Sequence, residues 1–122
     1  SSNCSNLPSE TGKIKNYGFY MTAYVVVDNE VKNQKEYQKY LKLITPTVHK
    51  YSGRYLIRAG KIIYHDSIWV PERLVVIAFD NESLASKWVN SEELSHIHAM
   101  RRKYSKSRLI IIEGVTDSIT GE

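Results

Sequence analysis

Two runs of β-type residues lie close together in the middle of the chain, joined by a short polar connector. The first covers residues 54–59 and the second covers residues 73–79, and each opens with an arginine. Both are rich in the branched and aromatic side chains that favour strands, and glycine and proline lie beside them. The pair therefore places two consecutive strands at the centre of the predicted fold.

A helix is predicted before this pair, between residues 33 and 51. Apolar side chains recur there at helical spacing and form one stripe, which indicates a helix packed on a core. Asn33 and Glu36 give the start of the helix a capping-box pattern. Pro46 is expected to kink this helix or to split it in two, and Gly53 is expected to end it as a left-handed cap.

The outer parts of the chain supply the remaining elements. Residues 20–31 predict a strand whose run Val25-Val26-Val27 indicates burial of both faces. Asn81 is positioned to cap a short helix, and Ser91 with two following acidic residues to open another. Residues 109–112, a run of leucine and isoleucines, predict the last strand.

The resulting order is β-α-β-β-α-β, which is a ferredoxin-like α+β plan with a four-stranded antiparallel sheet and helices on one face. In this plan one face of the sheet has no helix over it. The first and last strands are apolar on both faces, so a monomer would expose a large apolar patch. We therefore expect a homodimer formed by sheet-to-sheet packing.

Composition and spacing exclude several classes of site. The chain has 122 residues, a net charge of +4 and a single cysteine, so it cannot form an intrachain disulfide. His96 and His98 are two apart on a predicted helix and face different sides, so they cannot share a metal ion. Phosphate-binding and dinucleotide-binding glycine motifs are absent. We expect no metal site and no cofactor.

Partners and location are predicted from the same features. The third predicted strand lacks the aromatic and basic pattern of an RNA-binding sheet, and the basic cluster at residues 101–108 is interpreted as a solvated helix end, so we expect no nucleic-acid partner. No apolar run is long enough for a membrane helix. We expect a cytoplasmic protein; because the chain starts at Ser1, export after removal of a leader stays open as the alternative.

Short motifs spread along the chain carry a family resemblance. They are Tyr37-x-x-Tyr40, Pro46-Thr47, Gly53-Arg54-Tyr55-Leu56-Ile57-Arg58, Trp69-x-Pro71-x-Arg73, Ser91-x-Glu93, Arg101, Ser107-Arg108 and Glu113-Gly114. With these motifs the chain resembles domain-of-unknown-function family 1330, of the dimeric α/β-barrel (ferredoxin-like) superfamily. The resemblance implies a domain at residues 21–115, an N-terminal extension at residues 1–20 and a C-terminal tail at residues 116–122.

The resemblance supplies a fold and a dimer, but no reaction. Relatives in the superfamily include cofactor-free monooxygenases, isomerases and ligand-sensing domains, and a shared fold does not fix a function. Two departures from the family pattern concern glycine. Ser52 stands where a glycine is usual, and Ala59 replaces another glycine.

Candidate ligand-binding residues lie on and beside the predicted strands. Arg54 and Arg58 lie four apart on the predicted strand and so point to the same face, where they could bind a carboxylate or phosphate; the alternative is an edge strand protected by charge. Trp69 and Arg73 could form a stacked rim, or could pack at a dimer seam. Tyr24 could present its hydroxyl to a cavity, or belong to the core.

The last predicted helix carries two further candidates. Arg101 lies on the same face of that helix as the apolar stripe, so it could anchor an acidic ligand or pair with Glu36. His98 lies three residues earlier and is the candidate catalytic base; a structural histidine is the alternative.

We therefore carry three functional hypotheses. In the first, a homodimer binds a small acidic or aromatic metabolite between sheet and helices. In the second, the same scaffold is a cofactor-independent monooxygenase or isomerase. In the third, it is an interaction module without a cavity. A titratable group inside a cavity would separate the first two.

Overall fold

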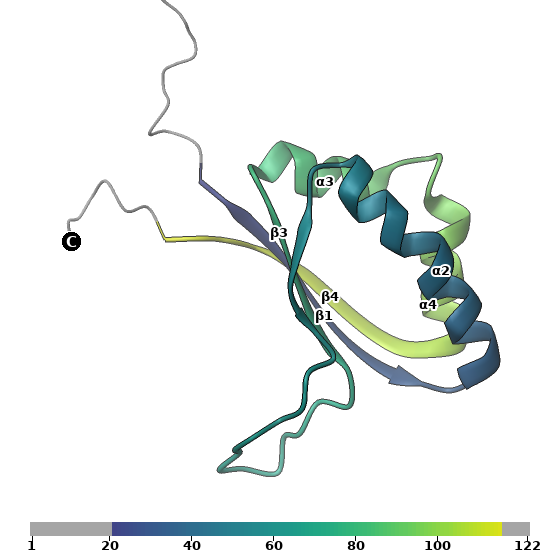
Figure 1. Ribbon diagram of the computed structural model, residues 1–122, viewed down its shortest axis with the longest axis vertical. Coiled ribbons are helices and arrows are strands. Elements are labelled where there is room, and N and C mark those ends of the chain that lie inside the picture. Colours follow the sequence, from purple (N-terminus) through teal and green to yellow (C-terminus); the bar gives the residue numbers. More distant parts are fainter. Residues whose placement is uncertain (1–20, 116–122) are drawn as a thin grey trace, which may run out of the picture.

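A computed structural model of the protein describes residues 21–115 (Figure 1), so the predicted extension and tail lie outside the described residues. The elements are β1 (Ala23–Val31), α2 (Gln34–Lys50), β2 (Arg54–Arg58), β3 (Leu74–Phe79), α3 (Glu82–Asn90), α4 (Ser95–Tyr104) and β4 (Ser105–Glu113). The strands form one antiparallel sheet in the order β2-β3-β1-β4. The predicted ferredoxin-like fold is confirmed.

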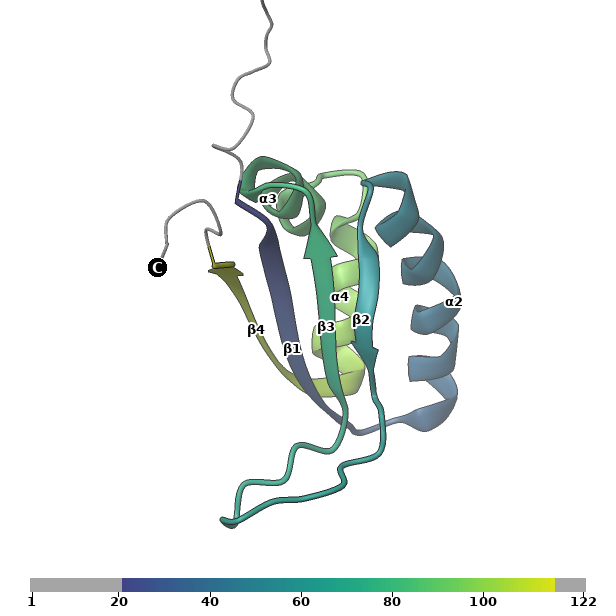
Figure 2. The same cartoon turned by 60° about the vertical axis from the view of Figure 1, so that its left-hand side comes forward.

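The sheet has one covered and one uncovered face. All three described helices lie on the same side of the strands, and the other side carries no element of the described chain (Figures 1 and 2). Residues 59–73, between β2 and β3, extend beyond the end of the sheet as an irregular connector. No described helix is long and apolar enough to cross a membrane.

The core lies between the sheet and the helices. Alternate residues of β1 and β3 point into it, and Val25 faces Ile77 across the two strands. Trp88 of α3 and Phe79 of β3 pack with ring centroids 5.6 Å apart, and both are fully buried. Burial of large apolar and aromatic side chains is the main stabilising contribution in a domain of this size.

Helix α2 begins where the cap predicts. The Asn33 side chain accepts a hydrogen bond from the Glu36 backbone N–H at 3.1 Å, but the Glu36 carboxylate pairs with Lys39 instead of closing the capping box. The helix runs through Pro46 without a break, so the expected division into two helices is wrong. Neighbouring Thr45 donates its hydroxyl to the Leu41 carbonyl within the same turn.

The chain leaves α2 differently from the prediction. The residue in the left-handed region is Ser52, with φ of 64°, and Gly53 has no positive φ. Gly53 is needed for space, because a Cβ there would lie 2.8 Å from a Phe79 ring carbon and 3.0 Å from Val48. The glycine therefore allows close packing, and the serine makes the turn.

Two boundaries near the C-terminus also differ. Ser91 to Leu94 form a turn in which the Leu94 N–H donates to the Ser91 carbonyl, so α4 starts at Ser95 and not at Ser91. β4 begins at Ser105, four residues before the predicted strand, and pairs with β1 along its whole length. The basic cluster at residues 101–108 therefore lies only partly at the end of a helix, since Lys106 and Arg108 belong to β4.

Candidate functional site

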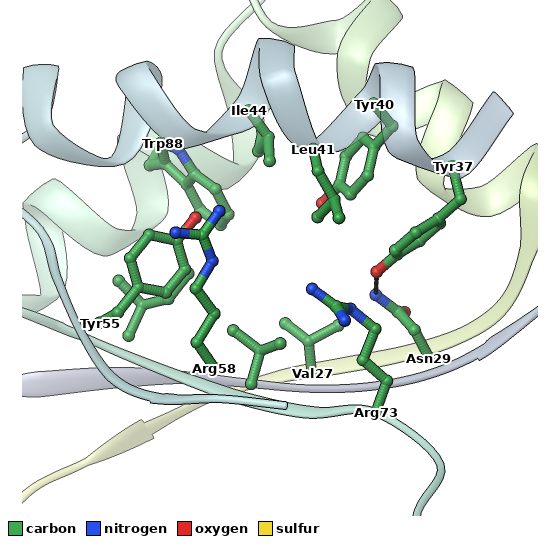
Figure 3. A pocket seen from close by; sticks show the side chains of 12 residues that line it. Val27, Asn29, Tyr37, Tyr40, Leu41, Ile44, Tyr55, Arg58, Arg73 and Trp88 are labelled. Atoms are coloured by element: carbon green, nitrogen blue, oxygen red, sulfur yellow. Dashed lines mark hydrogen bonds between the residues drawn. The ribbon is translucent and has the colours of Figure 1, made fainter. Parts of the chain in front are cut away.

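A cavity lies between α2 and the covered face of the sheet (Figure 3). Aromatic walls are provided by Tyr37, Tyr40, Tyr55 and Trp88, and strand residues such as Val75 and Ile77 form an apolar floor. The remaining polar lining consists of Asn29, Arg58 and Arg73. The volume of this cavity that the centre of a water molecule can occupy is about 20 Å³, which leaves room for about one ordered water.

A β-bulge directs Arg58 into this cavity. Arg54 is paired with Ala78, but the register shifts between Tyr55 and Ile57, so Arg58 is paired with Val75. The extra residue reverses the alternation of side chains. Arg58 therefore shares the covered face with Val75, whereas Arg54 lies on the uncovered face. The expectation that Arg54 and Arg58 share one face is wrong for this reason.

Arg58 is held at the cavity by two contacts. Its Nη2 donates a hydrogen bond to Thr45 Oγ1 of α2 at 2.6 Å, and its guanidinium lies 4.5 Å from the centre of the Tyr55 ring. Within residues 21–115, no carboxylate lies within 4.0 Å of this guanidinium. A cation held by a hydroxyl and a ring keeps its charge available to an anion.

Arg73 enters the same cavity from the residue before β3. Its guanidinium lies 5.4 Å from the centre of the Tyr37 ring, and its Nε is buried without a hydrogen-bond partner among residues 21–115. As with Arg58, none of the ion pairs found in the described chain includes it. Figure 3 shows both arginines pointing from the sheet toward α2.

The segment Thr45-Pro46-Thr47 fixes the side chains above the cavity. Thr47 donates its hydroxyl to the Ile44 carbonyl at 2.6 Å and accepts a hydrogen bond from Trp88 Nε1 at 2.9 Å. The Thr45 hydroxyl likewise accepts a hydrogen bond, from Arg58 Nη2. The two threonines beside the proline thus position one wall residue and one charged residue of the cavity.

His98 and Arg101 form a buried pair behind the cavity. His98 is 2% exposed; one ring nitrogen, Nε2, donates to the Trp88 carbonyl at 3.0 Å, and the other, Nδ1, accepts from Arg101 Nη1 at 2.7 Å. Burial, aided by the charge of Arg101, lowers the pKa of the His98 imidazole to about 4. His98 is therefore neutral at pH 7, with both nitrogens engaged.

Arg101, the other residue of the buried pair, is also engaged in contacts within the protein. Arg101 Nε donates to Ser107 Oγ at 3.0 Å, and Glu36, its expected partner, pairs with Lys39. Burial raises the pKa of the Tyr40 hydroxyl, and Arg101 partly offsets this effect. Tyr40 therefore stays protonated and available as a hydrogen-bond donor.

The structure brings two of the candidate ligand-binding residues to the cavity, namely Arg58 and Arg73. Arg54 lies on the uncovered face near Asp80, and Tyr24 lies on the same face opposite Ala78. Trp69 lies on the exposed connector, and Arg73 stacks on Tyr37 and not on this indole.

His98 and Arg101, the other two candidates, are buried but do not line the cavity. Sequence reasoning missed Asn29 as a lining residue, and it grouped Arg58 with Arg54 on one face instead of with Arg73. The second arginine of the Arg54–Arg58 motif was the available signal for Arg58, but the bulge that directs it is not visible in the sequence. In the described part of the chain, no group of three or more acidic, histidine or cysteine side chains could hold a metal ion.

Fold and cavity together define a ferredoxin-like domain with an arginine-lined cavity beneath one helix. The chain belongs to the family described as a domain of unknown function (DUF1330), whose model matches residues 22–115, and the predicted family is thereby confirmed. No curated protein matches the chain.

Solved structures share this fold. RPA0582, a protein of unknown function from Rhodopseudomonas palustris, gives a TM-score of 0.63 at 8% identity, covering 79% of this chain and 84% of that one. Its methylated form gives the same TM-score and identity, over 80% and 84%. A conserved protein from Methanosarcina mazei Go1 gives a TM-score of 0.50 at 17% identity, over 81% and 98%. At these identities the likeness shows the fold alone.

Proposed function

We propose that the protein is a homodimer that binds a small carboxylate, aliphatic or aromatic, in the cavity between α2 and the sheet. The observation that carries this proposal is the presence of two guanidinium groups, Arg58 and Arg73, at one cavity without a carboxylate partner among the described residues. Arg73 is partly buried, and a cation in that position without a counterion is costly, so an anionic ligand would relieve Arg73 and could also pair with the exposed Arg58.

The surrounding side chains favour a carboxylate over a larger anion. A guanidinium presents paired N–H donors that match the two oxygens of a carboxylate. The rings of Tyr37, Tyr55 and Trp88 offer apolar and aromatic contact for the rest of the ligand. The small volume requires an arginine to swing outward on binding, and Arg58 is suited to this because its side chain is exposed and makes one hydrogen bond within the described residues.

The proposed dimer uses the uncovered face of the sheet. Ile110 and Ile112 of β4 are 55% and 51% exposed, and they lie opposite Val26 and Tyr24 of β1. On the other edge, Leu56 and neighbouring residues of β2 are similarly exposed. A contiguous apolar face of this kind is unusual on a monomer, and a second copy of the same face would cover it with two-fold symmetry.

The enzymatic alternative has less support. Among the described residues, no carboxylate and no imidazole lines the cavity, so the cavity lacks a proton acceptor suited to neutral pH. His98 is buried, and both of its ring nitrogens are already hydrogen-bonded, one to the Trp88 carbonyl and the other to Arg101. The raised pKa of Tyr40 also makes that hydroxyl a poor base. Binding therefore accounts for the cavity better than proton transfer does.

Titration calorimetry with benzoate, and with uncharged benzamide as the control ligand, tests the binding proposal. We expect R58Q and R73Q each to weaken benzoate binding by about 1.5–3 kcal/mol, because each removes a charge-assisted hydrogen bond. The matched control is R54Q, since Arg54 lies on the same strand but faces away from the cavity. Equal effects of R54Q and R58Q, or equal affinity for benzamide, would reject the proposal.

A further inference from the structure

Polar groups without a partner gather at one end of the cavity. Asn29 Oδ1 and Arg73 Nε are buried and have no hydrogen-bond partner in the described chain. The Tyr37 hydroxyl accepts a hydrogen bond from Asn29 Nδ2 at 2.7 Å, and its own proton has no acceptor among residues 21–115. This end therefore has unused donors on Tyr37 and Arg73 and an unused acceptor on Asn29.

These three residues form a single cluster. The Asn29 backbone N–H donates to the Arg73 carbonyl at 3.1 Å, and the Arg73 guanidinium lies over the Tyr37 ring. Asn29 is 2% exposed and Tyr37 is 1% exposed, so bulk water does not satisfy them. In Figure 3 the cluster lies on one side of the cavity, and Arg58 with Tyr55 and Trp88 lies on the other.

The chemistry of the cluster restricts what can fill it. Buried polar groups are satisfied in folded proteins almost without exception, so a ligand atom or an ordered water is required here. A hydroxyl group can accept from Tyr37 and from Arg73 Nε and can also donate to Asn29 Oδ1. An ionised carboxylate has no donor for Asn29, and an ammonium has no acceptor and is repelled by Arg73.

We propose that the ligand is a hydroxycarboxylate, with its carboxylate between the guanidinium groups of Arg58 and Arg73 and its hydroxyl at Asn29, Tyr37 and Arg73 Nε. This inference rests on the proposed binding of a carboxylate and narrows its class. Asn29 is then the residue that selects for the hydroxyl group. A site built to hydrogen-bond a hydroxyl rejects the analogue that lacks it, because its buried groups are left unpaired.

Calorimetry with benzoate, 3-hydroxybenzoate and 4-hydroxybenzoate tests the inference. We expect the wild-type protein to bind at least one hydroxybenzoate about tenfold more tightly than benzoate, a typical effect of satisfying buried polar groups. N29L and Y37F should bring this ratio to about one, because both remove polar partners of the hydroxyl. R58Q should weaken benzoate and the hydroxybenzoates by a similar factor and leave the ratio unchanged.

The outcomes separate this inference from the proposed function. If no carboxylate binds, both fail. If benzoate and the hydroxybenzoates bind equally well, the carboxylate site stands, an ordered water satisfies the cluster, and the hydroxyl inference is overturned. A preference for hydroxybenzoate that persists in both N29L and Y37F would also overturn it. In that case Asn29 and Tyr37 would have only a structural role, and their replacement would change the stability of the protein but not the ratio of the two affinities. If N29L does not fold, Y37F alone decides the outcome.

Discussion

Ser52 and Ala59 have backbone φ values of 64° and 57°, in the left-handed region where a side chain is unfavourable. They flank β2. Ser52 makes the turn that lets Gly53 pack against Phe79 and Val48. The chain therefore carries backbone strain at both ends of the strand that delivers Arg58.

We predict that S52G stabilises the protein by about 0.5–1 kcal/mol, because relief of the left-handed strain exceeds the greater entropy of glycine in the unfolded chain. Urea unfolding followed by circular dichroism measures the change. The control is S83G, an exposed serine in the first turn of α3, where glycine should destabilise by up to about 0.5 kcal/mol. A destabilised S52G would show that the turn does not strain the chain.

The same neighbours show what the sequence could predict at the level of single residues. Gly53 was predicted as the left-handed residue because glycine adopts that conformation most easily. The structure uses Ser52 for the turn and Gly53 for close contact. A sequence indicates that a glycine is needed, but the reason for it depends on Phe79, which lies on another strand. Local caps such as Asn33 depend only on neighbours in the chain and were predicted correctly.

Helices α3 and α4 are linked through His98, whose Nε2 donates to the carbonyl of Trp88. Burial lowers the pKa of this imidazole from 6.5 to about 4 in the folded protein. Between these two values the unfolded chain binds a proton that the folded protein does not. Folding stability therefore falls as the pH drops from about 6.5 to about 4, and this contribution is constant below that range.

We predict that the loss from His98 alone amounts to about 3–3.5 kcal/mol, since the pKa values in the unfolded and folded states, 6.5 and about 4, are far apart and each pKa unit corresponds to about 1.4 kcal/mol. H98Q is the matched variant: glutamine can donate to the Trp88 carbonyl and accept from Arg101, but it does not titrate. Urea unfolding at a series of pH values from about 7.5 to about 4 should give a shallower loss for H98Q. Parallel pH profiles for the two proteins would contradict this assignment.

At the level of elements, the sequence predicted the order and the type of each element, because the periods of two and 3.6 residues are local properties. It did not predict the bulge in β2, because nothing in Arg54-Tyr55-Leu56-Ile57-Arg58 marks an extra residue; the shift is defined only by pairing with β3. That single residue decides which arginine reaches the cavity. The candidate site was therefore predicted less completely than the fold that carries it.

For the whole molecule, the two faces of the sheet have different proposed tasks. The covered face holds the cavity, and the uncovered face carries exposed Ile110, Ile112 and Leu56. The connector at residues 59–73 adds further exposed apolar side chains, including Ile63 and Ile68. A second copy packed on the uncovered face would bury this surface without touching the cavity. Assembly and ligand binding can thus be disrupted separately.

We predict that I110K gives a folded monomer, whereas the wild-type protein has twice the mass of one chain. Ile110 lies opposite Val26, which in turn lies opposite Val76, so a lysine there would place a charge among the apolar side chains of the proposed interface. Size-exclusion chromatography with light scattering measures both masses. The control is L43K, because Leu43 is 44% exposed but lies on α2, on the other side of the sheet. A wild-type monomer, or an equal loss of the dimer in L43K, would contradict sheet-to-sheet assembly. If I110K is a monomer and still binds benzoate, one chain contains the whole ligand site.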